Sequence, residues 1–240
     1  MKNPDKDDIA RRVAQLDWAR IGEGLDNVGA ALIKRLLAPA ECESLAALYD
    51  GGGRFRSRVV MQAHGYGKGE YKYFDYPLPP LIAKLRPALY SHIVPIANRW
   101  AAALGTTQFP AEHERFLQRC RKAGQGRATP LLLRYSEGDF NCLHQDLYGE
   151  HVFPLQATIL LSRPRHDFTG GEFVLVEQRP RMQSRAEVVP LEQGDAVIFA
   201  VRYRPAQGKR GMYRVAMRHG VSRLRSGERY TAGVIFHDAA

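Results

Sequence analysis

The spacing of apolar and polar residues changes near residue 129 and divides the chain into two halves. In the first half, apolar residues at helical intervals predict a short amphipathic helix over 7–17. The same spacing over 81–104 predicts either a pair of helices or one long broken helix. The segment 38–50 also predicts a helix, because Pro39 falls in its first turn and three glycines follow its end. Two further segments predict strands, 29–37 (GAALIKRLL) and 55–62 (FRSRVVMQ).

After residue 129, short apolar runs alternate with turn residues at 170–171, 194–195 and 226–227. Many short strands after a helical half predict an α+β protein whose second half is a double-stranded β-helix, or jelly roll, with an N-terminal extension of helices and strands. No internal repeat or low-complexity linker divides the chain, so a single domain over 1–240 is expected. The predicted strands are 130–137, 140–146, 154–162, 171–178, 186–192, 195–201, 214–224 and 229–236.

Composition says more about the cellular compartment of the protein than about its reaction. No apolar run is long enough to cross a bilayer, and the first residues lack the apolar core of a signal peptide. The three cysteines, Cys42, Cys120 and Cys142, are far apart and form no zinc motif, which suits a reducing compartment. We therefore expect a cytoplasmic protein with no membrane partner, and no obligate protein partner is evident.

Charge adds a hint about partners. The net charge is +10, so polyanions should be attracted. Between residues 200 and 229 nine basic residues accompany one acid, Glu228. This surplus is compatible with a solvated basic face as well as with a nucleic-acid surface.

Candidate metal ligands lie in the stretch RYSEGDFNCLHQDLYGEH, residues 134–151. On a strand, residues i and i+2 point to one face, so His144 and Asp146 would project together. His219 on a late strand is the candidate third ligand. Two histidines and one carboxylate leave coordination positions open, as in non-haem Fe(II) oxygenases. A bare His-x-Asp is also compatible with an ordinary polar pair.

A candidate anion site follows His219 after ten residues. Arg229 begins the last predicted strand, which we expect to pair with the strand of His219 through a turn at 226–227. A buried guanidinium there could pair bidentately with a dicarboxylate. The hydroxyl of Thr231 would share that strand face.

With these residues in order, the sequence resembles the 2-oxoglutarate/Fe(II)-dependent dioxygenases over about residues 130–238. Tyr135 with Gly138 resembles the family's Tyr-x-x-Gly, and Gly170-Gly171 resembles its turn into the next strand. The resemblance implies Fe(II) held by the triad, 2-oxoglutarate received by Arg229 with Tyr135 and Thr231, and O2 as a substrate. It also implies a catalytic core over 129–240 and a substrate-recognition part over 1–128.

The substrate is less defined. The chain resembles a bacterial AlkB-like family of oxygenases that act on damaged DNA, most clearly in 54–79. The Gly-, Tyr- and Pro-rich stretch 64–80 predicts a turn, a short strand and an irregular segment, and its tyrosines either stack an extruded base or simply cover the core. We expect the loop 202–211 to edge the mouth of the iron pocket and to contact phosphates. The candidate substrate residues are Arg58, Tyr71, Tyr73, Arg202, Arg204, Lys209 and Arg210.

Two alternatives stay open. Ile235 stands where AlkB-like enzymes have a second arginine, and Leu133 stands where they have an asparagine. Together with the ten-residue gap between His219 and Arg229, these departures favour a protein hydroxylase of the prolyl type. The second alternative is a non-catalytic, basic jelly roll that binds nucleic acid. Oxidative demethylation of alkylated bases in DNA repair remains the favoured prediction because of the basic segment around His219.

Overall fold

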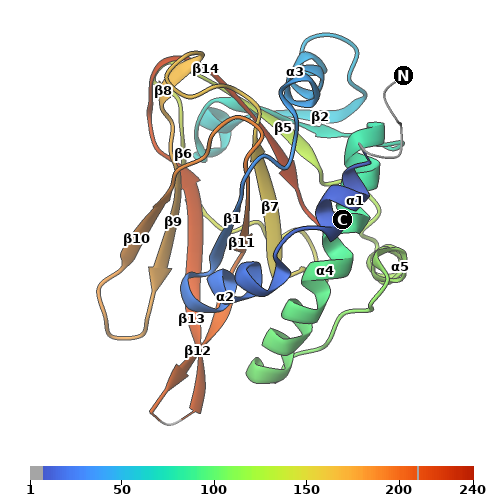
Figure 1. Ribbon diagram of the computed structural model, residues 1–240, viewed down its shortest axis with the longest axis vertical. Coiled ribbons are helices and arrows are strands. Elements are labelled where there is room, and N and C mark those ends of the chain that lie inside the picture. The colour runs from blue at the N-terminus through green and yellow to red at the C-terminus, as the bar shows by residue number, and fades with distance from the viewer. Residues whose placement is uncertain (1–7, 210) are drawn as a thin grey trace.

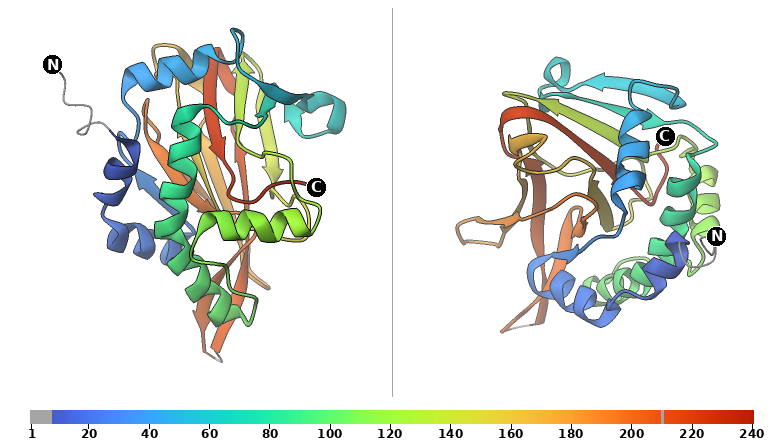
Figure 2. Two further views of the ribbon diagram at one scale, coloured as in Figure 1. Left: turned by 90° about the vertical axis from the view of Figure 1, so that its right-hand side faces the viewer. Right: turned by 45° about the horizontal axis from the view of Figure 1, so that its top comes forward.

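The computed structural model describes residues 8–209 and 211–240. Its helices gather along one side of two facing β-sheets (Figures 1 and 2). None of the helices in this part of the chain combines the length and apolar character needed to cross a membrane. The helices are α1 (Ile9–Ala14), α2 (Trp18–Val28), α3 (Pro39–Ala47), α4 (Pro80–Leu104), α5 (His113–Lys122) and the short 3-10 helix η2 (Met61–His64).

The two sheets form the jelly roll that the sequence predicts, and within the described residues their strands pair antiparallel. The larger sheet has the order β1 (Ala30–Ile33), β11 (Ala196–Ala200), β7 (Leu155–Leu160), β14 (Leu224–Val234), β5 (Leu131–Ser136), β4 (Glu70–Phe74) and β2 (Phe55–Val60), with β8 (Phe168–Gly170) beside β14. The smaller sheet has the order β10 (Arg185–Val189), β9 (Phe173–Gln178), β13 (Gly211–Val221), β6 (Phe140–His144) and β3 (Gly67–Lys68), with β12 (Tyr203–Gly208) beside β13.

All six residues of β7 are buried, so the strand is covered on both faces. Gln156 and Thr158 point into the space between the sheets, where they line a cavity. The alternate residues Ala157 and Ile159 face the other side, which the helices cover (Figure 2). The alternating polar residues of β7 therefore face the cavity and not the solvent. The larger sheet therefore forms the middle layer of the molecule.

The N-terminal half is built into this layer. β1 pairs with β11, and β4 pairs with β5. One core cluster contains residues from Ile9 in α1 to Phe236 near the C-terminus. The boundary near residue 129 thus marks a change in the spacing of apolar residues and not a border between two hydrophobic cores.

α4 is one continuous helix although Pro87 and Pro95 lie inside it. Each proline removes a backbone hydrogen-bond donor, which is why the sequence left open a pair of helices or a broken one. A long buried stripe opposes that loss. It consists of Ile82, Leu85, Leu89, Ile93, Ile96 and Trp100, spaced three or four residues apart.

The predicted pairing between the strands of His219 and Arg229 is wrong. β13 belongs to the smaller sheet and β14 to the larger one, so the chain changes sheets at residues 222–223. Ser226 and Gly227 lie within β14 and pair with β8. Gly227 has a φ of 79°. The glycine therefore does mark an unusual backbone conformation, but this is an irregularity inside a strand and not a turn between two strands. The consequence is that the two sheets bring His219 and Arg229 toward the space between them.

Candidate metal centre

Three predicted ligands meet between the sheets. His144 and His219 are directly opposed on β6 and β13, and their ring centroids are 4.2 Å apart. Asp146 lies two residues beyond the end of β6, so the loop and not the strand face brings it to the histidines. Its Oδ1 is 3.5 Å from His144 Nε2, and its Oδ2 is 3.3 Å from His219 Nε2. Two ligands about 2.1 Å from one ion at a right angle would be about 3 Å apart, so the spacing suits neighbouring metal ligands.

Hydrogen bonding indicates which atoms face the centre. The carbonyl of Cys142 must accept from His144 Nδ1 at 2.8 Å, so Nδ1 carries the proton and Nε2 offers a lone pair when the ring is neutral. That lone pair faces the Asp146 carboxylate, which is also an acceptor. One atom from each of His144, Asp146 and His219 lies within 4.8 Å of the others. Acceptors that converge in this way require a proton or a cation between them, and two histidines with one carboxylate suit Fe(II).

Charge stabilises the ionised carboxylate here. Burial alone would raise the pKa of Asp146, but the facing imidazoles of His144 and His219 hold that pKa well below its ordinary value. Burial lowers the pKa of His219, and the charge of His144 lowers it further. Burial opposes protonation of His144 as well, but Asp146 raises the pKa of that imidazole. An ionised carboxylate beside a neutral His219 is a state ready to bind a metal.

Arg229 enters the same cavity as an unpaired buried cation. Its side chain is almost completely buried, and it forms no ion pair within residues 8–209 and 211–240. Burial lowers the pKa of Arg229 to about 10. One guanidinium nitrogen donates to Thr231 Oγ1 at 2.5 Å, and the guanidinium lies 5.6 Å from the ring centroid of Tyr135, its cross-strand partner. A buried charge without a counter-ion is costly, so this cation favours an anionic ligand.

The cavity has a volume of about 400 Å³ and combines an apolar wall with unused polar atoms. Phe173 and Phe199 pack against His219, with ring centroids 6.0 and 4.6 Å from its own, and help to exclude water. Four lining atoms are buried without a hydrogen-bond partner among the described residues: Tyr135 Oη, Gln156 Oε1, His219 Nδ1 and Arg229 Nε. Buried polar groups are normally satisfied, so a polar ligand such as 2-oxoglutarate would fit this space.

Gly171 allows close packing beside Arg229. Its φ is +63°, and a Cβ at this position would lie 2.2 Å from Leu224 Cδ1 and 3.0 Å from Arg229 Cδ. Glycine adopts this backbone conformation without a steric penalty and leaves room for both side chains. The Gly170-Gly171 turn thus contributes to the wall of the anion site.

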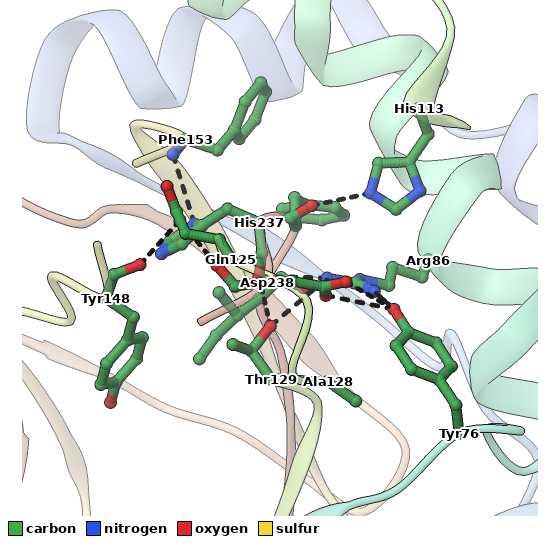
Figure 3. A network of polar contacts seen from close by, with 12 residues as sticks. Tyr76, Arg86, His113, Gln125, Ala128, Thr129, Tyr148, Phe153, His237 and Asp238 are labelled. Carbon is green, nitrogen blue, oxygen red and sulfur yellow. Dashed lines mark hydrogen bonds and ion pairs between the residues drawn. The ribbon is translucent and has the colours of Figure 1, made fainter. Parts of the chain in front are cut away.

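Tyr148 is a site residue that was not predicted from the sequence, and its hydroxyl donates to Asp146 Oδ1 at 2.7 Å. Gln125 fixes the loop behind it by donating to the carbonyls of Tyr148 at 2.8 Å and Asp238 at 2.7 Å (Figure 3). Asp238 in turn pairs with the buried Arg86 of α4 at 2.8 Å. The i+2 spacing from Asp146 was visible in the sequence, but the contact depends on a loop conformation that the spacing does not specify. Tyr148 therefore orients the carboxylate from outside the ligand set.

The predicted substrate residues of the N-terminal half separate into two groups. Tyr71 lines the metal cavity, and Tyr73 contacts Tyr71 edge-on at 5.3 Å without lining it. Arg58 forms an ion pair with Glu70 and does not line the cavity either. A residue that the prediction did not single out, Tyr66, lies at the cavity with about half of its surface exposed. Its position between two glycines in an aromatic stretch was the available signal.

The predicted basic loop 202–211 is largely a strand hairpin, and two of its residues need correction. Arg204 is buried, with an ion pair to Glu177 at 2.6 Å and a hydrogen bond to the Asp26 carbonyl, so it is not free for a phosphate. Lys209 lies at the hairpin tip, about 26 Å along β13 from His219, and does not edge the cavity. Arg202 is exposed and lines a different cleft. Arg210 lies outside the described residues.

Sequence comparisons identify relatives over most of the chain. Residues 69–239 match the profile of the Oxygenase-NA family, described as "Oxygenase, catalysing oxidative methylation of damaged DNA". Uncharacterized protein Rv2227 of Mycobacterium tuberculosis (strain ATCC 25618 / H37Rv) is 52% identical over 168 residues, which is 70% of this chain and 72% of that protein. Protein MT2286 of strain CDC 1551 / Oshkosh matches to the same extent.

Solved structures share the fold. A prolyl-4-hydroxylase of Pseudomonas putida superposes with a TM-score of 0.53 at 14% identity, covering 90% of this chain and 96% of its own. An oxidoreductase of the 2OG-Fe(II) oxygenase family from Burkholderia pseudomallei superposes with a TM-score of 0.50 at 17% identity, covering 94% of each chain. At these identities the likeness concerns architecture.

Proposed function

This chain belongs to the Oxygenase-NA family, and from that premise we propose that it is a 2-oxoglutarate/Fe(II)-dependent dioxygenase that oxidatively demethylates alkylated bases of nucleic acid. The observation that carries the proposal is the match over residues 69–239, because the description of that family refers to damaged DNA. The aromatic side of the cavity supports it. Tyr66 and Tyr71 offer flat surfaces against which an extruded base could lie.

The residues divide the work between metal, co-substrate and substrate. In this proposal His144, Asp146 and His219 bind Fe(II), which supplies oxygen activation when 2-oxoglutarate is present. Arg229 and Thr231 receive the distal carboxylate, and the Tyr135 hydroxyl lies in the same cavity as a further donor. Tyr148 holds one oxygen of Asp146, which leaves the other oxygen for the metal. Phe173 and Phe199 keep bulk water from the deep side of the centre.

A protein hydroxylase of the prolyl type is the second candidate. Leu133 lines the cavity where AlkB-like enzymes have an asparagine, and Ile235 is buried where they have a second arginine. Leu133 would suit an apolar side chain of a protein substrate, whereas Ile235 packs in a core cluster and does not line the cavity. The non-catalytic alternative does not agree with the family, which consists of oxygenases.

Mass spectrometry of the products tests the substrate class. The enzyme is incubated with Fe(II), 2-oxoglutarate, ascorbate and O2, and separately with methylated single-stranded DNA, methylated duplex DNA and a pool of proline-containing peptides. We expect the methylated strand to lose the mass of a methylene group in the parent and to stay unchanged with His144→Ala. If only the peptides change, by the mass of one oxygen atom, the hydroxylase replaces the demethylase.

A further inference from the structure

A second cleft, larger than the metal cavity, opens beside the β12–β13 hairpin. Its volume is about 670 Å³, within the range of small-ligand sites. The C-terminal end of α4, the middle of α5, the loop over 147–154 and the residues that lead into β12 border it. In Figure 1 the hairpin and the end of α4 lie at the same end of the molecule. We call this space the hairpin cleft.

Three arginines give the hairpin cleft its charge. Arg119, Arg202 and Arg214 line it, and none forms an ion pair within residues 8–209 and 211–240. Arg119 donates to the carbonyl of Gln108. One acid, Glu150, also lines the cleft, and about three quarters of its side chain is exposed to solvent. The remaining positive charge makes the cleft complementary to an anion.

The arginines occur beside an aromatic surface. The guanidinium carbons of Arg202 and Arg214 lie 4.9 and 5.7 Å from the ring centroid of Tyr203. Tyr203 is half-buried, whereas both arginines are exposed. Aromatic rings and guanidinium planes stack nucleobases, and guanidinium groups pair with phosphates. A phosphate next to a base is the unit of a nucleic-acid strand.

The cleft adjoins the metal cavity. Leu147, which directly follows the candidate ligand Asp146, lines both spaces and is well exposed. A strand that places one nucleotide in the metal cavity can therefore continue across Leu147 into the hairpin cleft. We propose that the hairpin cleft is a second nucleotide subsite for a single strand. Arg202 and Arg214 each pair with a backbone phosphate, and Tyr203 stacks a base next to the oxidised nucleotide. The inference rests on the proposed function, whose substrate it extends beyond one base.

Salt-dependent binding tests the subsite without any turnover. The probe is a fluorescently labelled oligothymidylate of roughly ten nucleotides without methylated bases, a length typical of single-strand sites. For the full-length variant Arg202→Gln/Arg214→Gln, the slope of log affinity against log salt should fall by about 1.4, since each phosphate contact contributes about 0.7 on a single strand. Tyr203→Leu should weaken binding about tenfold with an unchanged slope, because it removes stacking and no charge.

The matched control is Arg20→Gln/Lys84→Gln. It removes the same charge from exposed positions on α2 and α4 that line neither cavity. Circular dichroism checks that every variant is folded. The control should bind like the parent. The subsite is refuted if the control loses as much oligothymidylate affinity as the Arg202/Arg214 variant, or if the salt slope of that variant is unchanged. A parent that binds no oligothymidylate at low salt refutes it as well.

A labelled polyglutamate peptide provides the rival anion. If the Arg202/Arg214 variant loses peptide binding but keeps oligothymidylate binding, the cleft takes an acidic peptide and the nucleotide subsite is refuted. Failure of the proposed function has a different signature, because the parent would then demethylate no methylated nucleic acid whatever its binding. Failure of the subsite alone leaves demethylation by the parent intact, with the same Michaelis constant for methylated strands in the Arg202/Arg214 variant.

Discussion

Arg229 illustrates which features of a single site residue can be predicted from the sequence and which cannot. Its distance from His219 along the chain and the neighbouring Thr231 indicated an anion site, and the structure brings both residues into the cavity of the candidate triad. The lack of a counter-ion could not be predicted, because it depends on which residues of β5 and β8 surround the guanidinium. Tyr135 and Phe168 lie there, at 5.6 and 5.9 Å.

Replacing Arg229 should therefore affect the co-substrate more than the metal. Arg229→Gln removes the charge from a hydrogen-bonded pair worth about 1.5–3 kcal/mol, so the apparent Michaelis constant for 2-oxoglutarate should rise about 10- to 150-fold. Iron affinity should stay nearly the same. Steady-state succinate formation and an iron titration measure the two effects. An unchanged Michaelis constant would mean that another group receives the distal carboxylate.

Tyr148 should affect the metal without being a ligand. Tyr148→Phe removes the hydrogen bond to Asp146 Oδ1 and keeps the ring. Loss of such an outer partner typically weakens metal binding about 10- to 100-fold. Spectroscopic titration with Co(II) as a substitute ion measures this, with Tyr66→Phe as the control at an exposed position of the same cavity. Equal Co(II) affinity in parent and Tyr148→Phe would contradict the role.

At the scale of elements, local patterns identified the strands of the jelly roll but not their partners. β6, β7 and β13 lie where short apolar runs predict them. β12 was taken for a basic loop because its residues, YRPAQG, are poor strand formers, and pairing with β13 along its whole length stabilises it. α2 escaped notice because Gly22 and Gly24 weaken its helical signal, although Ile21 and Leu25 form a buried stripe. Tertiary packing decided both cases.

The joint between α4 and the C-terminal segment is the clearest test of element packing. Arg86 donates to Asp238 and to the carbonyls of Ile235 and His237 (Figure 3). Arg86→Met would leave the buried Asp238 carboxylate without its cationic partner and should lower the free energy of unfolding by about 3–5 kcal/mol. The double variant Arg86→Met/Asp238→Asn should recover part of this loss. Urea unfolding measures both, and equal stability of parent and Arg86→Met would refute the joint.

For the whole molecule, buried histidines predict acid sensitivity. Burial and the charge of Arg86 lower the pKa values of His113 and His237 to about 3. Below the unfolded value of about 6.5, the unfolded chain binds protons that the folded protein does not. Stability is therefore complete above pH 6.5 and is lost as the pH falls, by about 1.4 kcal/mol per pH unit for each histidine.

His113→Gln isolates one of these contributions. The amide can still donate to the carbonyl of Phe236, which His113 contacts at 2.7 Å, but it does not titrate. Urea unfolding between pH 6.5 and pH 5 should show a smaller pH slope for the variant than for the parent. Identical slopes would mean that His113 is protonated in the folded state.

Succinate release that depends on a methylated base would show both the metal centre and the nucleic-acid substrate in one measurement. The enzyme with Fe(II), 2-oxoglutarate and O2 is given either a methylated single-stranded oligonucleotide or the same sequence without methyl groups, in the parent and in His144→Ala. We expect the methylated strand to stimulate succinate release in the parent and neither strand to do so in His144→Ala. Equal release with both strands in the parent would contradict the nucleic-acid substrate, and undiminished release in His144→Ala would contradict the metal centre itself.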